Sequence, residues 1–390
     1  MSKKSNCPYC GDSPINHTLA YVGQTCGVFL DPLISLIAGT SNGLFSKILV
    51  IFNRVFISYS LFIGVLKFNK DVNRANTGRS KVIWEEANRR GIEMEQLVIY
   101  GKPIEQYRAK IKNNKWFYFE SLPIPPNLPQ DSYNYIDDKI QLKKVLDKSG
   151  IPVPKSISVK NKQQTIDAFN SLIKPVIVKP RVGSRGRHTT VFINTESELI
   201  HAFNIAQKLC KYVAIEEYLV GPVCRATLVD GKLVGFFIGR APVIIGNGEN
   251  TITELIEEKN KNRNERIDKI IINNEHVEYL ARQGYSMTSI PESDKKIQVL
   301  SRTGRFFGGE TEEFLPHVHP KLITILEKAV SVINVPIVGF DVIIENPGED
   351  PDKEHWGIIE ANSLPFIDLH YFPLYGDPVN IASYIWDLWK

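Results

Sequence analysis

Two short apolar runs within residues 337–362 each contain acidic side chains, and this feature constrains the fold more than any other. The first run, residues 337–344, reads Ile-Val-Gly-Phe-Asp-Val-Ile-Ile and contains Asp341; the second, residues 356–362, ends in Glu360-Ala361-Asn362. Side chains alternate along a strand, so Glu360 and Asn362 point to one face, and a neighbouring strand can bring Asp341 beside them. We therefore expect two adjacent buried strands with oxygen donors gathered on one face.

These oxygen donors are of the kinds that bind a hard metal ion. Two carboxylates and a neutral amide oxygen suit Mg²⁺, which keeps several waters and takes further ligands from phosphate; Mn²⁺ is the alternative ion. Either run alone is more simply interpreted as a buried strand that ends in acidic residues. Together they favour a metal site at Asp341, Glu360 and Asn362, because unpaired carboxylates among Ile and Val are costly.

Length, charge and cysteine content narrow the class of protein. At 390 residues the chain is long enough for two or three subdomains and a sizeable core. Its 47 Lys and Arg against 43 Asp and Glu are scattered, so we expect no nucleic-acid partner. Five cysteines, an odd number in a long chain, do not indicate a disulfide framework and fit a reducing cytoplasm.

The first residues carry a C-x-x-C pair rather than an export signal. Residues 1–11 are polar instead of basic and then apolar, so export is not expected. Cys7-Pro8-Tyr9-Cys10 has the spacing of half a zinc site, and His17 or Cys26 could supply further ligands. A lone C-x-x-C is weak evidence, so reduced thiols without metal are the favoured interpretation and zinc at Cys7 and Cys10 the alternative.

Residues 28–68 form the most apolar stretch of the chain. Lys47, Asn53 and Arg54 interrupt it, and an Arg near a bilayer centre costs about 2.5–3.5 kcal/mol on insertion scales. The sequence favours a buried helix pair or strand and leaves open a helix that lies in the membrane interface. We predict that the segment does not span a bilayer.

The remaining pattern is that of an α+β protein with mixed sheets. We expect a helix over residues 79–91 that ends at Gly91, a strand over 96–100, and a helix over 139–149. The proline-rich residues 122–129 are expected to link two domains.

A lysine ends another apolar strand just before a glycine-containing loop. Residues 174–180 end in Lys179-Pro180, and residues 181–187 contain Gly183 and Gly186. A lysine in this place can hold phosphate oxygens as a point charge, and the glycines allow close approach and loop movement. An ordinary hairpin with solvated arginines is the alternative. Residues 213–221 are expected to be a strand that breaks into a turn able to bind a flat ring.

Taken together and in order, these segments resemble the ATP-grasp superfamily over residues 135–390, with most similarity to the ATP-grasp part of cyanophycin synthetases and bifunctional glutathione synthetases. The matching segments are 138–139 with 150–154, 178–180 and its loop, 246–256, 308–310, 318–320, 338–341, and 359–365 leading to His370. The resemblance implies two α+β subdomains that clamp ATP, preceded by a small α/β pre-ATP-grasp domain. It divides the chain into an apolar extension with the C-x-x-C pair (1–70), that small domain (71–134) and the ATP-grasp domain (135–390).

The resemblance also implies roles for individual residues. The phosphate-binding lysines are Lys139 and Lys179, of which Lys179 also counts as catalytic. The lid is Gly183, Ser184, Arg185 and Gly186, continuing to Arg187. The adenine-binding hinge is Glu216, Glu217, Tyr218 and Leu219. The metal ligands are Asp341, Glu360 and Asn362; Arg302 or Arg305 lies near the transferred phosphate, and Arg225 matches an arginine of cyanophycin-type enzymes. Two departures are Val223, where relatives often carry an acid that meets the ribose, and His188, which replaces a glycine at the end of the lid.

The function that the resemblance implies is an ADP-forming carboxylate-amine ligase, which makes an amide bond through an acyl phosphate. The alternatives are a nucleotide-binding scaffold without activity and an ATP-grasp kinase. The chain lacks the second ligase half of either relative, so we expect one ligation, with a small carboxylate and an amine such as an amino acid or short peptide as substrates. Residues 257–292 are expected to contribute to substrate choice. A cytoplasmic location is expected, with membrane contact through residues 28–68 and a homo-oligomer left open.

Overall fold

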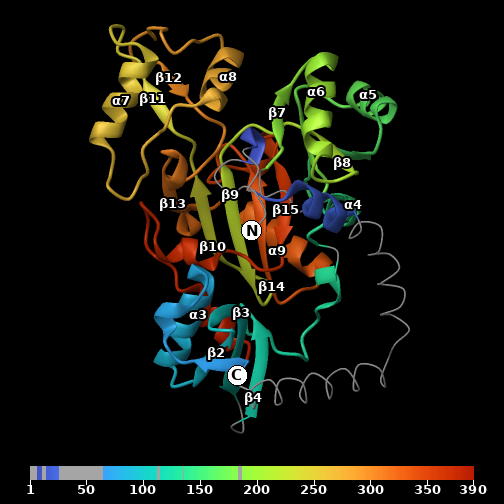
Figure 1. The fold of residues 1–390 in the computed structure, drawn as a ribbon, viewed down its shortest axis with the longest axis vertical. Helices are drawn as coiled ribbons and strands as arrows, with labels where there is room; N and C mark the ends of the chain where they lie inside the picture. Colours follow the sequence, from blue (N-terminus) through green and yellow to red (C-terminus); the bar gives the residue numbers. More distant parts are fainter. Residues whose placement is uncertain (1–6, 11–14, 26–64, 112–114, 135, 183–186) are drawn as a thin grey trace.

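The computed structural model describes residues 7–10, 15–25, 65–111, 115–134, 136–182 and 187–390. These residues form four units, each built around one antiparallel sheet (Figure 1). The N-terminal unit, in blue to teal, lies at one end of the central sheet. The middle unit, in green, and the inserted unit, in yellow to orange, lie apart from each other at its other end.

The N-terminal unit, residues 65–134, is a four-stranded sheet with one long helix. Its strands lie in the order β1 (Leu66–Asn69), β2 (Met94–Ile99), β3 (Lys102–Ile111) and β4 (Lys115–Glu120), with α3 (Gly78–Arg89) between β1 and β2 in the chain. The Thr77 side chain accepts from the backbone N–H of Ser80 and so caps α3. Trp84 is buried edge-on against Tyr107, with ring centroids 6.0 Å apart. Because β1 pairs with β2, the predicted domain boundary at residue 70 falls inside this unit.

The last helix of the described chain completes the core of the N-terminal unit. Helix α10 (Ile381–Asp387) packs against α3, and Trp386 Nε1 donates to Ile83 O at 3.0 Å. Trp389 Nε1 donates to Pro123 O at 2.6 Å, and Arg90 Nη1 pairs with Asp387 Oδ1 at 2.8 Å. Residues of the N-terminal unit and of the C-terminal helix therefore share one apolar core.

The middle unit, residues 151–221, has its sheet in the order β5 (Ser156–Val159), β8 (Val213–Glu217), β6 (Val176–Pro180) and β7 (Thr190–Ile193). Two helices, α5 (Lys162–Ser171) and α6 (Glu196–Gln207), pack on the sheet. Thr195 and Glu198 form a capping box at the start of α6. Helix α4 (Lys139–Lys148) lies between this unit and the central sheet, and Asp138 caps it by accepting from Ile140 N at 2.9 Å.

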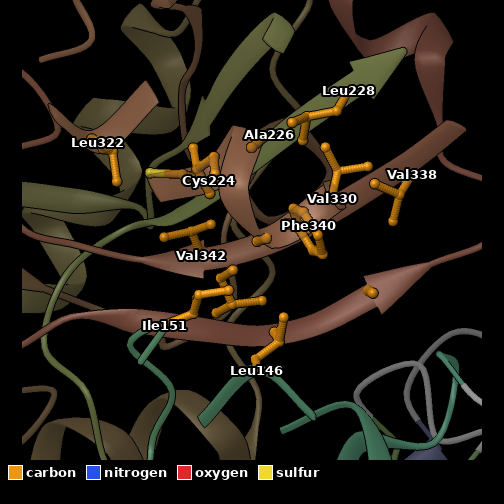
Figure 2. Packing of buried hydrophobic residues seen from close by; sticks show 14 of the residues in the cluster. Leu146, Ile151, Cys224, Ala226, Leu228, Leu322, Val330, Val338, Phe340 and Val342 are labelled. Atoms are coloured by element: carbon orange, nitrogen blue, oxygen red, sulfur yellow. The ribbon is translucent and has the colours of Figure 1, made fainter. Parts of the chain in front are cut away.

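The central sheet has the order β13 (Thr311–Glu313), β10 (Lys232–Gly239), β9 (Val223–Val229), β14 (Ile337–Ile343) and β15 (Gly357–Asn362). Figure 2 shows its main core, in which Phe340 of β14 and Cys224 of β9 lie among apolar side chains from other elements. Leu146 comes from α4, and Leu322 comes from α9 (Pro320–Ile333). Since even-numbered residues of β9 and β14 fill this core, the odd-numbered residues of these strands face the opposite side of the sheet.

The inserted unit, residues 243–300, separates β10 from β13 in the chain. It contains β11 (Val243–Ile245), α7 (Ile252–Asn262), α8 (Asn274–Arg282) and β12 (Lys296–Gln298), with a small core of its own. The short 3-10 helices of the described chain are η1 (Pro8–Cys10), η2 (Val72–Arg74), η4 (Asp131–Asn134), η5 (Arg305–Phe307), η6 (Leu315–His317), η7 (Pro351–Lys353) and η8 (Ile367–Tyr371).

The helices and strands expected from the sequence are present, with shifts of at most two residues at their ends. The helices expected over 79–91 and 139–149 are α3 and α4, and the acidic apolar runs are β14 and β15. Most of the apolar segment 28–68 lies outside the described residues, so the prediction about it is not tested. Across the ranges that the structure describes, no helix combines the length and the apolar character needed to cross a membrane.

Candidate active site

Three strands of the central sheet place the predicted metal ligands side by side. Asp341 of β14 is the register partner of Glu360 on β15 and of Arg225 on β9. Arg225 Nη2 donates to Asp341 Oδ2 at 3.1 Å, and its Nε contacts the other carboxylate oxygen. Lys139 Nζ of α4 lies 3.3 Å from Glu360 Oε2. The expectation that these carboxylates are unpaired is wrong, since each contacts a cation.

The electrostatic environment differs between the two carboxylates. Burial raises the pKa of Asp341 to about 6, against the opposing charge of Arg225. Burial alone would also raise the pKa of Glu360, but Lys139 and then Lys179 outweigh it and hold that pKa below its usual range. Glu360 is the more open of the two, because 32% of its side chain is exposed compared with 12% for Asp341. At neutral pH both groups are therefore mainly ionised, and the site opens toward solvent on the side of Glu360.

Asn362 completes the predicted ligand set. It is the register partner of Gly339 on β14, and its Nδ2 donates to Gly339 O at 3.4 Å. A hydrogen bond from the Asn362 side chain also lowers the pKa of Asp341, although burial has the larger opposite effect. With Nδ2 used in this way, Oδ1 is the atom of Asn362 that can bind a cation. Two carboxylates and an amide oxygen within one strand pair fit Mg²⁺.

Next to this acidic group lies a buried cluster of two lysines around one glutamate. Lys143 Nζ of α4 is 2.5 Å from Glu216 Oε1, and Lys179 Nζ at the end of β6 is 2.6 Å from Glu216 Oε2. Ser156 Oγ donates to Glu216 Oε1 at 3.0 Å. All three charged side chains are at most 9% exposed. Two cations share one carboxylate, so the cluster has an excess positive charge in a poorly solvated place.

The pKa values of the cluster reflect this excess. Burial lowers the pKa of Lys143 to about 7, because the attraction of Glu216 only partly compensates and Lys179 repels the charge. Burial would raise the pKa of Glu216, but Lys143 and Lys179 together hold it at about 2. An anion bound beside Lys179 would supply the missing negative charge. The cluster is therefore suited to a phosphate group.

Lys143 is a residue that the sequence interpretation missed. It follows Lys139 by one helical turn, so both can lie on one side of α4. The four-residue spacing is the signal in the sequence that indicates Lys143 beside Lys139. Arg181 was missed in the same way: its Nη2 lies 2.6 Å from Asp138 Oδ2 and ties the start of α4 to the end of β6. This ion pair fixes Lys139 relative to Lys179.

The predicted lid and hinge are described only in part. Gly183, Ser184, Arg185 and Gly186 lie outside the described residues, so their role stays a prediction. In the hinge, the Glu216 side chain is turned toward the two lysines. Tyr218 N donates to Pro175 O at 3.1 Å, and its ring lies edge-on to Phe192. Glu217 and Leu219 are both buried. The adenine-binding role of the four hinge residues stays a prediction.

The two candidate arginines near the transferred phosphate have different surroundings. Arg302 Nε donates to Glu275 Oε1 at 2.9 Å, and its guanidinium lies 5.3 Å from the Phe307 ring centre. Arg305, at the start of η5, makes no ion pair with any residue that the structure describes, and burial lowers its pKa. Their loop is held by Gly304 N donating to Arg240 O at 3.0 Å. No contact with the carboxylates of β14 and β15 is seen for either arginine within the described part.

His370, the end of the last matching segment, lies in a fully buried polar network on the same side of β9 as Arg225. Thr227 Oγ1 is 2.8 Å from His370 Nε2, and Glu313 Oε2 is 2.5 Å from Nδ1. A Cβ at Gly235 would come within 2.6 Å of the imidazole ring, so only glycine fits there. The network links β9, β10 and β13 on the face of the sheet that also carries Arg225 and Asp341.

The chain is similar in sequence to two kinds of synthetase. It is 29% identical over 260 residues to cyanophycin synthetase of a Synechocystis species, which covers 64% of this chain and 30% of the relative. It is 27% identical over 327 residues to the glutathione biosynthesis bifunctional protein of Clostridium perfringens, covering 79% of this chain and 40% of the relative. The chain thus spans less than half the length of these curated relatives. No protein-family model matches it.

The fold is shared with a solved structure of the same kind. The crystal structure of a bifunctional glutathione synthetase from Pasteurella multocida matches 80% of this chain and 43% of that chain, with a TM-score of 0.54 and 21% sequence identity. Together with the sequence similarities, this confirms the predicted resemblance and the predicted α+β fold class.

Proposed function

Because the chain has the ATP-grasp fold, we propose that it is an ATP-dependent carboxylate-amine ligase that forms an amide bond and releases ADP. One observation carries the proposal: Lys139 of α4 and Lys179 of β6 both interact electrostatically with Glu360, the register partner of Asp341. Lys139 lies 3.3 Å from Glu360, and the charge of Lys179 lowers the Glu360 pKa against the effect of burial. Cations next to oxygen ligands for a metal ion are what phosphoryl transfer requires.

The proposed reaction has two steps. A carboxylate oxygen of the first substrate attacks the γ-phosphorus of ATP, the bond from that phosphorus to the bridging oxygen breaks, and ADP leaves. The amine nitrogen of the second substrate then attacks the acyl carbon of the acyl phosphate. The carbon-oxygen bond to phosphate breaks, inorganic phosphate leaves, and the nitrogen loses a proton. Exclusion of water matters because water would hydrolyse the acyl phosphate.

The residues of the chain have distinct roles in this scheme. Lys139 and Lys179 contact phosphate oxygens, and Glu216 with Lys143 fixes the position of Lys179. Asp341, Glu360 and Asn362 would hold Mg²⁺, or Mn²⁺ in its place, which neutralises phosphate charge when bound. Arg225 holds Asp341 in place. The lid residues 183–186 are proposed to cover the phosphates and the hinge residues 216–219 to bind the adenine ring.

Of the two candidate arginines, we favour Arg305 for the transferred phosphate. Arg302 is engaged by Glu275 and Phe307, whereas Arg305 has no such partner among the described residues. The loop that carries Arg302 and Arg305 lies near the start of β9. Thr303 Oγ1 of this loop lies near Gly239 of β10, and Gly239 is the register partner of Val223, the first residue of β9. Asp341 pairs with β9 only two residues farther along. The loop that carries Arg305 therefore lies near the end of the sheet that carries Asp341.

The substrates are proposed to be a small carboxylate and an amine, such as an amino acid or short peptide. A cavity of about 210 Å³ lies between α7, the chain that follows it, and the loop before β13. Its wall includes Lys259, Arg263, Asp268 and Glu310. Both signs of charge are present, which suits a zwitterionic substrate. This supports the expectation that residues 257–292 contribute to substrate choice.

The location of the protein is proposed to be the cytoplasm, where ATP is supplied. The four cysteines in the described ranges are all outside disulfides, in keeping with a reducing compartment. Peripheral membrane contact through residues 28–68 and homo-oligomer formation are further proposals. Carbonate extraction and size-exclusion chromatography of the full chain test them.

The experiment that tests the proposed function is a screen of amino acids and short peptides for ADP release, with mass spectrometry of the product. A ligase releases ADP only with both substrates and gives a product of their summed mass less one water. ADP release without an amine, with a stable phosphorylated product, would instead show a kinase. Nucleotide binding without turnover by any pair would favour a scaffold. Glu360→Gln serves as the inactive control.

A further inference from the structure

A second group of metal-binding side chains lies away from the proposed active site. Cys7 and Cys10 come from the start of the described chain, His17 from the helix over residues 17–25, and His188 from the turn before β7. Cys10 Sγ is 3.1 Å from His17 Nε2 and 3.5 Å from His188 Nε2, and Cys7 Sγ is 3.4 Å from His188 Nε2. The four candidate ligand atoms all lie within 4.8 Å of one another.

This arrangement has the size of a tetrahedral zinc site. Zn–S bonds of ~2.3 Å and Zn–N bonds of ~2.0 Å place the ligand atoms of a tetrahedron roughly 3.3–3.8 Å apart. The three thiol-imidazole separations, 3.1, 3.4 and 3.5 Å, are close to this range. If the side chains only formed separate thiol-imidazole hydrogen bonds, each thiol would need to approach only one imidazole. Here Cys10 approaches both imidazoles and His188 approaches both thiols, so the four atoms form one connected group, all within 4.8 Å of one another.

The supporting shell also fits a metal. His188 is 1% exposed, and its Nδ1 lies 2.7 Å from Ile205 O. A backbone carbonyl in this place keeps the proton on Nδ1 and leaves the Nε2 lone pair for a metal. The C-x-x-C turn is shaped by Cys10 N donating to Cys7 O at 3.1 Å, and His188 N donates to Tyr9 O at 2.9 Å. Both cysteine and histidine ligands are therefore held by backbone contacts.

We propose that Cys7, Cys10, His17 and His188 bind one Zn²⁺ ion, which fastens the N-terminal segment to the middle unit. Four protein ligands fill a tetrahedral shell and leave no position for substrate, as in structural zinc sites. The ion would join side chains 181 positions apart in the sequence. The helix over residues 17–25 also contacts the middle unit, since Lys211 N donates to Thr25 Oγ1 at 3.1 Å. The zinc site would therefore attach the N-terminal segment to the ATP-grasp region.

The site changes the interpretation of two residues. His188, noted in the sequence only as a replacement for glycine, becomes a ligand. Cys26, considered beside His17 as a further ligand, lies outside the described residues. The favoured expectation of thiols without metal is thus replaced by the proposal of a Cys₂His₂ site.

The test is the metal content of the full-length chain, purified without chelator and measured by inductively coupled plasma mass spectrometry. We expect one zinc ion per chain, and loss of that ion in Cys7→Ser, Cys10→Ser and His188→Gln. Cys224→Ala, which alters a buried cysteine of the central core, should keep its zinc. Cys26→Ser should also keep it, whereas His17→Gln should lose it. The opposite result for these two variants would overturn the assignment of His17.

Cobalt substitution gives a readout of geometry that does not depend on activity. Co²⁺ bound by two thiolates and two imidazoles in a tetrahedron shows strong visible absorption and a thiolate charge-transfer band. Both bands should be present in the wild-type chain and absent in Cys7→Ser, which replaces a partly exposed ligand. A well-folded wild-type chain that binds neither zinc nor cobalt would overturn the proposal. So would a bound metal that survives replacement of His188.

Chelation tests the fastening role. Removal of zinc should lower the melting temperature of the wild-type chain and speed proteolysis within residues 7–25. The same treatment should leave Cys7→Ser unchanged, because that variant has no ion to lose. Equal protease sensitivity of the wild-type chain with and without zinc would refute the role of the ion in docking the segment.

Discussion

Replacement of Glu216 by glutamine should destabilise the interface between α4 and β8 in a way that depends on pH. The carboxylate of Glu216 lies within 2.6 Å of the amino groups of both Lys143 and Lys179, and its side chain is 1% exposed. Removing one partner of a buried ion pair costs about 3–5 kcal/mol, because it leaves a charge buried without compensation. We expect a loss in this range at pH 7 in Glu216→Gln.

The loss should shrink as the pH rises. In the wild-type chain the pKa of Lys143 is lowered to about 7 in the fold, while an unfolded lysine keeps its proton to about pH 10.4. The unfolded state then binds more protons, so stability increases with pH by up to about 1.4 kcal/mol per unit per proton. In the variant Lys179 also loses its ion-pair partner. A second proton is lost on folding, and the difference from wild type should narrow by up to ~3 kcal/mol between pH 7 and pH 9.

The assay is hydrogen-deuterium exchange of peptides that cover α4 and β8 at pH 7, 8 and 9, corrected for the intrinsic pH dependence of exchange. Glu217→Gln is the matched control, because Glu217 is also buried but makes no ion pair among the described residues. This variant should lose less than about 1 kcal/mol of stability at every pH. Lys143→Met should remove the wild-type pH dependence, because it removes the excess cation. A loss in Glu216→Gln below about 1 kcal/mol, or one equal at pH 7 and pH 9, would refute the charge argument.

Three further predictions concern catalysis. Glu360→Gln should reduce ADP formation by at least about 100-fold while the circular dichroism spectrum stays that of wild type, and near-normal turnover would remove Glu360 from the metal site. Lys179→Ala should weaken ATP binding, measured by calorimetry, and lower kcat, measured by ADP release. Both change because a phosphate contact that strengthens in the transition state affects both. Unchanged binding and kcat would show that Lys179 has only a structural role. Arg305→Ala should lower kcat by about 10²–10³-fold, more than Arg302→Ala does. The reverse order in steady-state kinetics would assign the transferred phosphate to Arg302.

Local patterns in the sequence predicted the strands that carry the metal ligands, because burial and alternation are properties of single strands. Asp341 and Glu360 lie on β14 and β15 as expected, and the register pairs them directly. The cations that contact them were not predicted as partners. Arg225 and Lys139 belong to other elements, and no local pattern specifies which strand or helix will lie beside a given carboxylate.

The same limit explains the residues that were missed or interpreted differently. Lys143 shares a helical face with Lys139, but its importance comes from Glu216 on β8, a long-range partner. Glu216 was predicted from its place in a hinge, and the direction of its side chain depends on how β8 pairs with β5 and β6. His188 was predicted only as a replacement for glycine at the end of the lid, because its neighbours in space come from the start of the chain.

The packing of α10 against α3 has a consequence for protein synthesis. The core of the N-terminal unit is closed by Trp386 and Trp389, which donate to Ile83 O and Pro123 O. A ribosome adds roughly 5–20 residues per second, so Trp386 follows Glu120 only after on the order of 10–50 s. During that interval the buried face around Trp84 lacks its partner and is exposed to other chains. The N-terminal unit is thus synthesised early, but its core is closed only after α10 has been made. Until then its exposed apolar face can bind chaperones.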